Sequence, residues 1–96
     1  MAIPPLHWES FDFGGAAIEG LNDLHSLAFN EMKEMGLHDV ENRTSEVVGF
    51  SNDTIVSVCF VEFSHVKWRA IVMAAGEHSK SLRDKLIDRF AKATFL

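Results

Sequence analysis

The chain has 96 residues and a formal net charge of −5 at pH 7, from 14 acidic and nine basic side chains, and 47% of its residues are hydrophobic. This length predicts one domain, and the apolar content is that of a folded protein. The acidic balance opposes general binding to nucleic-acid phosphates, which draws on Lys and Arg. No apolar run approaches the ~20 residues that cross a bilayer, so we expect no membrane contact.

The cysteine content and the start of the chain bear on localisation. Cys59 is the single cysteine and has no partner for an internal disulfide, which fits a reducing compartment. The stretch from Met1 to Glu9 has neither the basic nor the apolar segment of a secretory signal. We therefore expect a cytoplasmic protein.

Residues 1–14 are predicted to form an extended arm that is rich in aromatic side chains. Pro4 and Pro5 oppose a helix. The large apolar residues that follow are Leu6, Trp8, Phe11 and Phe13. Because such side chains lose about 1.5–3 kcal/mol each when they stay in water, the arm is expected to dock. It would do so on its own domain, as a short edge strand for example, or on another subunit.

A helix is predicted from Gly15 to Met35, at the start of a single α+β domain over residues 15–96. Its apolar residues recur at steps of three or four and form one stripe: Ile18, Leu21, Leu24, Ala28, Met32 and Met35. Gly36 followed by Leu37 predicts a Schellman motif, in which a left-handed glycine ends the helix and an apolar residue folds back on it.

Three strands and a second helix are predicted after a polar loop over His38–Arg43. The strands span Glu46–Phe50, Ile55–Phe63 and Val66–Ala75. The second helix begins with Ser79 or Ser81 as its N-cap and runs to about Ala93. The resulting order is α-β-β-β-α. Short links predict a three-stranded antiparallel meander with both helices on one face.

The second and third predicted strands are apolar on both faces, whereas a strand commonly buries only one. A tight turn at Ser64–His65 predicts pairs that place five apolar side chains on the face away from the helices: Val56, Val58, Phe60, Ile71 and Met73. An exposed patch of this kind marks a binding surface. We interpret these five residues as an interface, with Trp68 and Arg69 at its margin.

Three occupants of this face stay open: the arm, a second copy of the chain and an apolar small molecule. Two-fold dimers are the commonest soluble oligomers. The leading interpretation is therefore a small non-enzymatic binding or protein-interaction module that self-associates as a homodimer. An apolar small-molecule pocket near the interface is part of this interpretation. The candidate ligand-binding residues are Trp68, Arg69, His65 and Glu62.

An enzyme is the first alternative, with His65, Glu62 and Arg69 in a cleft at the end of the sheet. Cys59, in the middle of a strand, is interpreted as structural because a catalytic thiol needs an accessible, electropositive setting. The five histidines show no metal-motif spacing on a predicted element, so we expect no metal and no cofactor.

The α-β-β-β-α order is similar to that of the double-stranded-RNA-binding domain. Residues 76–85, Gly-Glu-His-Ser-Lys-Ser-Leu-Arg-Asp-Lys, resemble the entry of that family into its final helix. The resemblance implies that Lys80 contacts phosphate, while Ser81 occupies the second basic position. Ser51-Asn52-Asp53 replaces the loop that the family has before its second strand. RNA recognition by that module follows a basic surface, so in this acidic chain we interpret the likeness as one of topology, and nucleic acid is not an expected partner.

Overall fold

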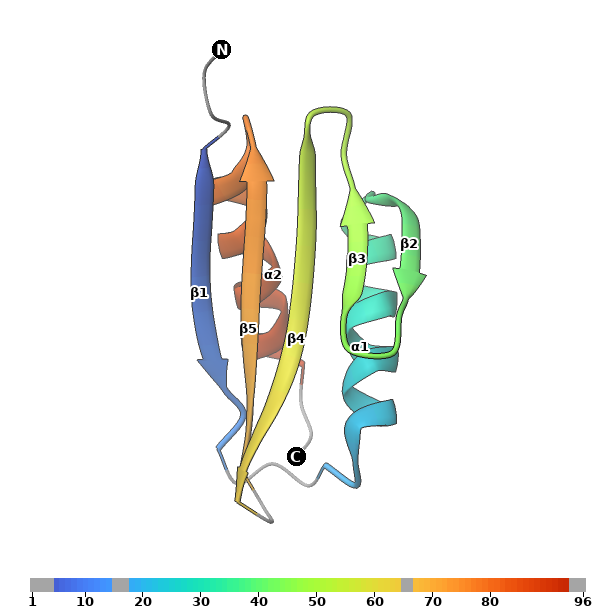
Figure 1. The fold of residues 1–96 in the computed structure, drawn as a ribbon, viewed down its shortest axis with the longest axis vertical. Coiled ribbons are helices and arrows are strands. Elements are labelled where there is room, and N and C mark those ends of the chain that lie inside the picture. Colours follow the sequence, from blue (N-terminus) through green and yellow to red (C-terminus); the bar gives the residue numbers. More distant parts are fainter. Residues whose placement is uncertain (1–4, 15–17, 65–66, 94–96) are drawn as a thin grey trace.

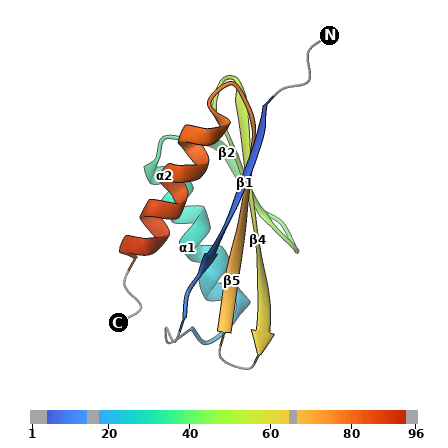
Figure 2. The same cartoon turned by 90° about the vertical axis from the view of Figure 1, so that its left-hand side faces the viewer.

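A computed structural model describes residues 5–14, 18–64 and 67–93. These residues form one antiparallel sheet of five strands, in the order β1-β5-β4-β3-β2, with two helices on one face (Figure 1, Figure 2). Along the chain the elements are β1 (Leu6–Asp12), α1 (Leu21–Glu34), β2 (His38–Asn42), β3 (Val47–Phe50), β4 (Thr54–Ser64), β5 (Lys67–Gly76) and α2 (Ser79–Lys92). The predicted α+β class is confirmed. The predicted meander corresponds to β3, β4 and β5, and the sheet gains one more strand at each side.

The predicted arm contains β1, which lies at the edge of the sheet of its own domain. β1 pairs antiparallel with β5, from Leu6 opposite Ala75 to Asp12 opposite Arg69. Just past the strand, the ring of Phe13 lies 5.7 Å from the ring of Phe90 on α2. One side of β1 therefore contributes to the core beneath the helices.

The polar segment predicted as a loop contains β2, the edge strand on the other side of the sheet. β2 pairs with β3 alone, and Val40 is its only partly buried residue. The register is irregular between His38 and Glu41, and Asp39 has a φ of 52°. A short, polar strand with a bulge lacks the apolar alternation by which strands are predicted, so the loop prediction was wrong here.

α1 begins at Leu21 rather than at Gly15, and residues 15–17 lie outside the described part of the chain. The predicted Schellman ending is confirmed. Gly36 has a φ of 87°. The Gly36 N–H donates to the carbonyl of Lys33 at 3.0 Å, and the Leu37 N–H donates to that of Met32 at 3.1 Å. Leu37 is buried, so the chain turns back onto the sheet directly after the helix.

The core lies between the helices and one face of the sheet. Its most deeply buried members are Leu24, Ala28 and Met32 of α1, Leu86 and Phe90 of α2, and Val47, Val56, Val58, Ala70, Val72 and Ala74 of the sheet. Gly76 ends β5 with a φ of 134°, and a Cβ there would lie 2.1 Å from the carbonyl oxygen of Asp53. A glycine at this position thus allows the turn between β3 and β4 to approach the start of α2.

The register between β4 and β5 differs by one residue from the prediction. Phe60 pairs with Ala70 and Val58 with Val72, because Ser64 pairs with Lys67 and an irregularity between Glu62 and Ser64 shifts the rest of the strand. Side chains alternate along a strand, so this shift exchanges the two faces of β4 relative to those of β5. It turns Val56, Val58 and Phe60 toward the helices, where the first two are fully buried and the third packs against the core. Their predicted place on the uncovered face was wrong.

Neither serine caps α2, contrary to the prediction. His78 occupies the N-cap position without a side-chain capping bond, and Ser79 is the first helical residue. The backbone N–H of His78 donates to Thr54 Oγ1 at 3.0 Å, and its ring Nδ1 lies 3.0 Å from Asp53 Oδ1. These contacts fasten the start of α2 to the turn between β3 and β4.

The contact between His78 and Asp53 predicts a stability term that depends on pH. The hydrogen bond with His78 lowers the pKa of Asp53 below its usual 3.8, and the hydrogen bond with Asp53 raises the pKa of His78 above its usual 6.5. The Asp53 contribution is present above pH 3.8 and is lost as the pH falls through its folded pKa. The His78 contribution is present below pH 6.5 and is lost as the pH rises through its folded pKa.

We therefore expect the melting temperature of the wild type to exceed that of Asp53→Asn most between about pH 4 and pH 6.5. The variant keeps an amide oxygen that accepts from Thr54, so the comparison isolates the charge. Thermal unfolding of both proteins from pH 3 to pH 9 measures the difference. A difference that stays constant over this range would contradict the charge interaction.

Candidate interaction surface

The face of the sheet away from the helices, called here the open face, carries most of the exposed large apolar side chains. Seven such side chains occur among the described residues: Leu6 (63% exposed), Trp8 (63%), Leu21 (37%), Ile55 (39%), Val61 (37%), Phe63 (62%) and Met73 (37%). All except Leu21 lie on the open face. Figure 2 shows both helices on the opposite side of the sheet, so no described helix shields this surface.

The strand pairing arranges the open face in rows that run from β1 across β5 and β4 to β3. The first row is Leu6, Ala75, Ile55 and Phe50; the second is Trp8, Met73, Ser57 and Val48; the third is Ser10, Ile71 and Cys59; the fourth is Asp12, Arg69 and Val61. Over these four strands the first three rows contain no charged side chain. The open face is therefore mainly apolar, with Asp12 and Arg69 at one end and the Glu46 carboxylate, which accepts from Ser57 Oγ at 2.9 Å, beside the second row.

The charges at that end compensate one another. Asp12 Oδ2 lies 3.4 Å from Nη2 of Arg69, and the Arg69 guanidinium lies 4.9 Å from the centre of the Phe63 ring. The Gly14 N–H donates to Asp12 at 2.7 Å, and this bond, together with Arg69, lowers the pKa of the Asp12 carboxyl. Asp12 is consequently charged at neutral pH and is paired with a cation.

Cys59 lies at the middle of β4, the central strand, and is partly exposed on the open face. Burial raises the pKa of its thiol, and the nearby carboxylate of Glu46 raises it further. A raised pKa keeps the thiol protonated at neutral pH, which disfavours a nucleophilic role. These surroundings, partly buried and close to a carboxylate, fit the structural interpretation of Cys59.

Both edges of the sheet carry features that resist the addition of another strand. The Phe13 N–H donates to Trp68, and the Gly76 N–H donates to Pro5, so the odd-numbered residues of β1 bond to β5. The even-numbered residues then direct their backbone groups outward. On that side Arg83 donates to the Trp8 carbonyl at 3.1 Å. At the other edge, β2 is short, acidic and irregular, and such edges pair poorly with other sheets.

The predicted ligand-binding residues are not gathered at one place. Glu62 pairs with Trp68, which packs against the core on the helix side. Arg69 points to the open face, toward Phe63. His65 lies outside the described residues. The predicted cleft at the end of the sheet would therefore have to draw side chains from both faces.

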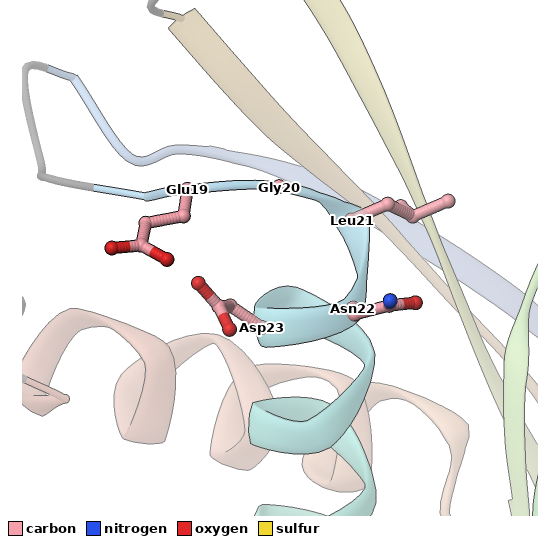
Figure 3. A pocket seen from close by; sticks show the side chains of 5 residues that line it. All are labelled: Glu19, Gly20, Leu21, Asn22 and Asp23. Carbon is pink, nitrogen blue, oxygen red and sulfur yellow. The ribbon is translucent and has the colours of Figure 1, made fainter.

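Other hollows of the molecule lie away from the open face. One lies at the start of α1, where the carboxylates of Glu19 and Asp23 face the same opening (Figure 3). Another lies at the start of α2 and is lined by Pro5, His7, Glu77, His78, Ser79, Lys80, Ser81 and Asp84. Neither borders the open face, so neither supports the predicted apolar pocket near the interface.

Two histidines join helices to strands. His7 Nδ1 lies 2.8 Å from Ser79 Oγ, but Ser79 is only 1% exposed, and a nucleophilic serine must be open to its substrate. His25 Nδ1 lies 2.7 Å from Asn42 Oδ1, with the ring beneath the surface beside Phe60. Both contacts fix elements of the fold. Among residues 5–14, 18–64 and 67–93, no group of three or more His, Cys, Asp or Glu could hold a metal ion.

Of the five predicted interface residues, Ile71 and Met73 lie on the open face, and Arg69, predicted at its margin, lies there too; the prediction did not include the other exposed apolar residues of this face. Leu6 and Trp8 did carry a signal, because they are spaced by two and lie out of phase with Phe11 and Phe13. A strand with that pattern presents apolar groups on both faces.

Within the described part of the chain, neither helix has the length and apolar character needed to span a membrane. No family model, no curated protein and no solved structure matches this chain. The open face is therefore the feature from which a function is inferred.

Proposed function

We propose that the protein is a small non-enzymatic interaction module that self-associates as a homodimer through its open face. The observation that supports this proposal is the exposure of large apolar side chains on one face of the sheet, with Trp8, Leu6 and Phe63 each more than 60% exposed. Monomeric soluble proteins rarely leave a contiguous patch of this kind in water. Burial of the patch against a second copy removes it from water on both chains at once.

The size of the patch fits a dimer of moderate strength. The distance from Ile55 to Phe63 along β4 is about 26 Å, and four strands span about 19 Å, so the open face covers on the order of 500 Å². Standard interfaces bury about 800 Å² per partner, and weaker, transient ones bury less. We therefore expect a dimer that dissociates on dilution.

The charge distribution also favours contact through this face. The chain carries a net charge of −5, which opposes the approach of two copies. The first three rows of the open face are mainly apolar. The Asp12–Arg69 pair at its end is internally compensated, and the Glu46 carboxylate beside Ser57 is paired with Arg43 at 3.2 Å. Two copies can therefore meet over this surface without bringing unpaired acidic groups together.

The alternative functions have less support. An enzyme would need its catalytic groups in one accessible cleft, whereas Ser79 is covered and Glu62 and Arg69 lie on opposite faces of the sheet. RNA binding would rely on Lys80, which shares its hollow with the acidic side chains of Glu77 and Asp84. In addition, four strands lie between α1 and α2, where the order that resembles the RNA-binding family has three.

The test is the solution mass of the wild-type chain over a range of concentrations. Sedimentation equilibrium should give twice the chain mass of 10.8 kDa in concentrated protein and a fall toward one chain on dilution. The reaction of Cys59 with a thiol reagent should slow as the protein is concentrated, because the dimer covers it. A mass of one chain even near the solubility limit would contradict the proposal.

A further inference from the structure

We infer that the two copies meet over β1, β5 and β4 only, and that a polar network beside β2 and β3 stays outside the contact as its border. This inference rests on the proposed self-association and names the part of the open face that takes part in it. β2 and β3 lie on the side of the sheet away from β1 (Figure 1). The exposed apolar side chains and the paired charges divide the open face between these two sides.

The exposed apolar surface of the open face belongs to three strands. Its six large exposed side chains lie on β1, β4 and β5: Leu6, Trp8, Ile55, Val61, Phe63 and Met73. On β3, Val48 is 1% exposed and Phe50 is half-buried, so both are already covered in large part within the single chain. The β2 residues opposite them are Glu41 and His38, which are polar. A second copy can therefore remove apolar surface from water mainly over β1, β5 and β4.

A network of four residues, called here the polar border, follows the other side of the open face. The Arg43 guanidinium lies 2.8 Å from Oε2 of Glu41 and 3.2 Å from Oε1 of Glu46. The second carboxylate oxygen of Glu46 accepts from Ser57 Oγ of β4 at 2.9 Å. The backbone N–H of Arg43 also donates to the Glu46 carbonyl at 2.8 Å. The polar border thus joins the turn between β2 and β3 to the central strand.

The polar border is more stable in water than inside the contact. Its two carboxylates and one guanidinium leave a net charge of −1, and the side chains of Glu41 and Arg43 are 56% and 50% exposed. Covering them would remove three charged groups from water, which is costly unless the opposing surface supplies matching polar groups. The large exposed side chains of β1, β4 and β5 supply none. Interface centres are poor in charged residues and their rims are polar, so the polar border has the composition of a rim.

Thiol labelling of single-cysteine variants maps the contact. In a Cys59→Ser background, Leu6→Cys places a thiol on β1 and Glu41→Cys places one in the polar border, and both positions are exposed in the single chain. Each variant is labelled with a small maleimide at concentrations at which sedimentation shows one chain and at which it shows a dimer. Lys85→Cys, exposed on α2, is the matched control in the same background.

A covered thiol reacts only in the free chain, so its labelling rate follows the free fraction. We expect the rate for Leu6→Cys to fall at least about 10-fold once less than about a tenth of the chains are free. The rates for Glu41→Cys and Lys85→Cys should change by less than about 2-fold, because neither position is covered.

The dissociation constant of the dimer gives a second measurement. Trp8→Ala removes the larger of the two most exposed side chains of β1 and should raise the dissociation constant at least ~30-fold, as for an interface hot spot. Glu46→Gln keeps an oxygen that accepts from Ser57 and should change it by less than about 3-fold, because charged groups at a rim contribute little. Circular dichroism checks that both variants are folded.

The outcomes separate this inference from the proposed function. A dimer by mass in which Leu6→Cys and Glu41→Cys are both protected, or in which Glu46→Gln weakens association as much as Trp8→Ala, overturns the border and leaves self-association through the open face intact. A dimer that protects Lys85→Cys but not Leu6→Cys overturns both, as does a chain that stays monomeric by mass. Protection of Leu6→Cys alone, with weaker association of Trp8→Ala alone, supports the inferred contact.

Discussion

Phe90→Ala is expected to lower the free energy of unfolding by about 3–5 kcal/mol, which is the usual range for truncating a buried phenylalanine. Phe90 is 1% exposed, and its ring lies 5.7 Å from that of Phe13, 6.2 Å from that of Phe60 and 6.3 Å from that of Phe11. Its loss would leave a cavity where α2, β1 and β4 meet. A domain of this size commonly has only 5–15 kcal/mol of stability, so the variant should be close to unfolding.

Urea unfolding in dilute protein, where association does not contribute, measures this effect. The matched control is Phe63→Ala, which makes the same substitution at a residue that is 62% exposed on the open face. We expect the control to change the stability of the monomer by no more than ~0.5 kcal/mol. Equal losses in the two variants would contradict the assignment of the two phenylalanines to opposite faces of the sheet.

Met73→Lys is expected to convert the proposed dimer into a monomer while the fold is retained. Met73 lies in the second row of the open face and is 37% exposed, so a lysine there stays in water in the single chain. In the dimer its ammonium group would be enclosed beside the Glu46 carboxylate, which Ser57 and Arg43 already engage, and symmetry would bring in a second ammonium group. Enclosing an unpaired charge costs several kcal/mol, so the dissociation constant should rise at least ~100-fold.

Leu21→Lys is the matched control, because Leu21 has the same 37% exposure but lies on α1. Its mass should match that of the wild type at every concentration. Circular dichroism of both variants checks that each is folded. If Met73→Lys remains as dimeric as the wild type, the open face is not the interface. If Leu21→Lys dissociates as well, the association involves the helix side.

Local signals in the sequence predicted the parts of the fold that local chemistry determines. Gly36 and Leu37 identified the end of α1, because only a left-handed residue followed by an apolar one completes the Schellman bonds. The strands β3, β4 and β5 followed from their apolar runs. β2 could not be found in this way, because an edge strand that contacts water on most sides has polar residues at nearly every position.

The assignment of faces on β4 and β5 could not be derived from the pattern alone. Both phases of β4 are apolar, with Val56 and Val58 in one and Ile55 and Val61 in the other, so neither phase marks the core. The choice depends on a single-residue irregularity after Glu62, next to the hairpin turn. For this reason Val56, Val58 and Phe60, which were predicted as interface residues, pack on the core side of the sheet. The residues next to them in the chain, such as Ile55 and Val61, lie on the open face instead.

The hydrogen bond from Arg83 to the Trp8 carbonyl limits how the protein can assemble. When a chain adds to an unpaired edge strand, its own far edge stays unpaired and can accept another chain. Growth by this route has no end point and leads toward fibrils. A face-to-face contact ends with the dimer, because each chain then has its apolar face covered and cannot bind a third chain through it. The Arg83 guanidinium occupies a backbone acceptor of β1 at one edge of the sheet, and the positive φ of Asp39 distorts β2 at the other edge. Association through the open face would therefore stop at a dimer, which can stay in solution at high concentration.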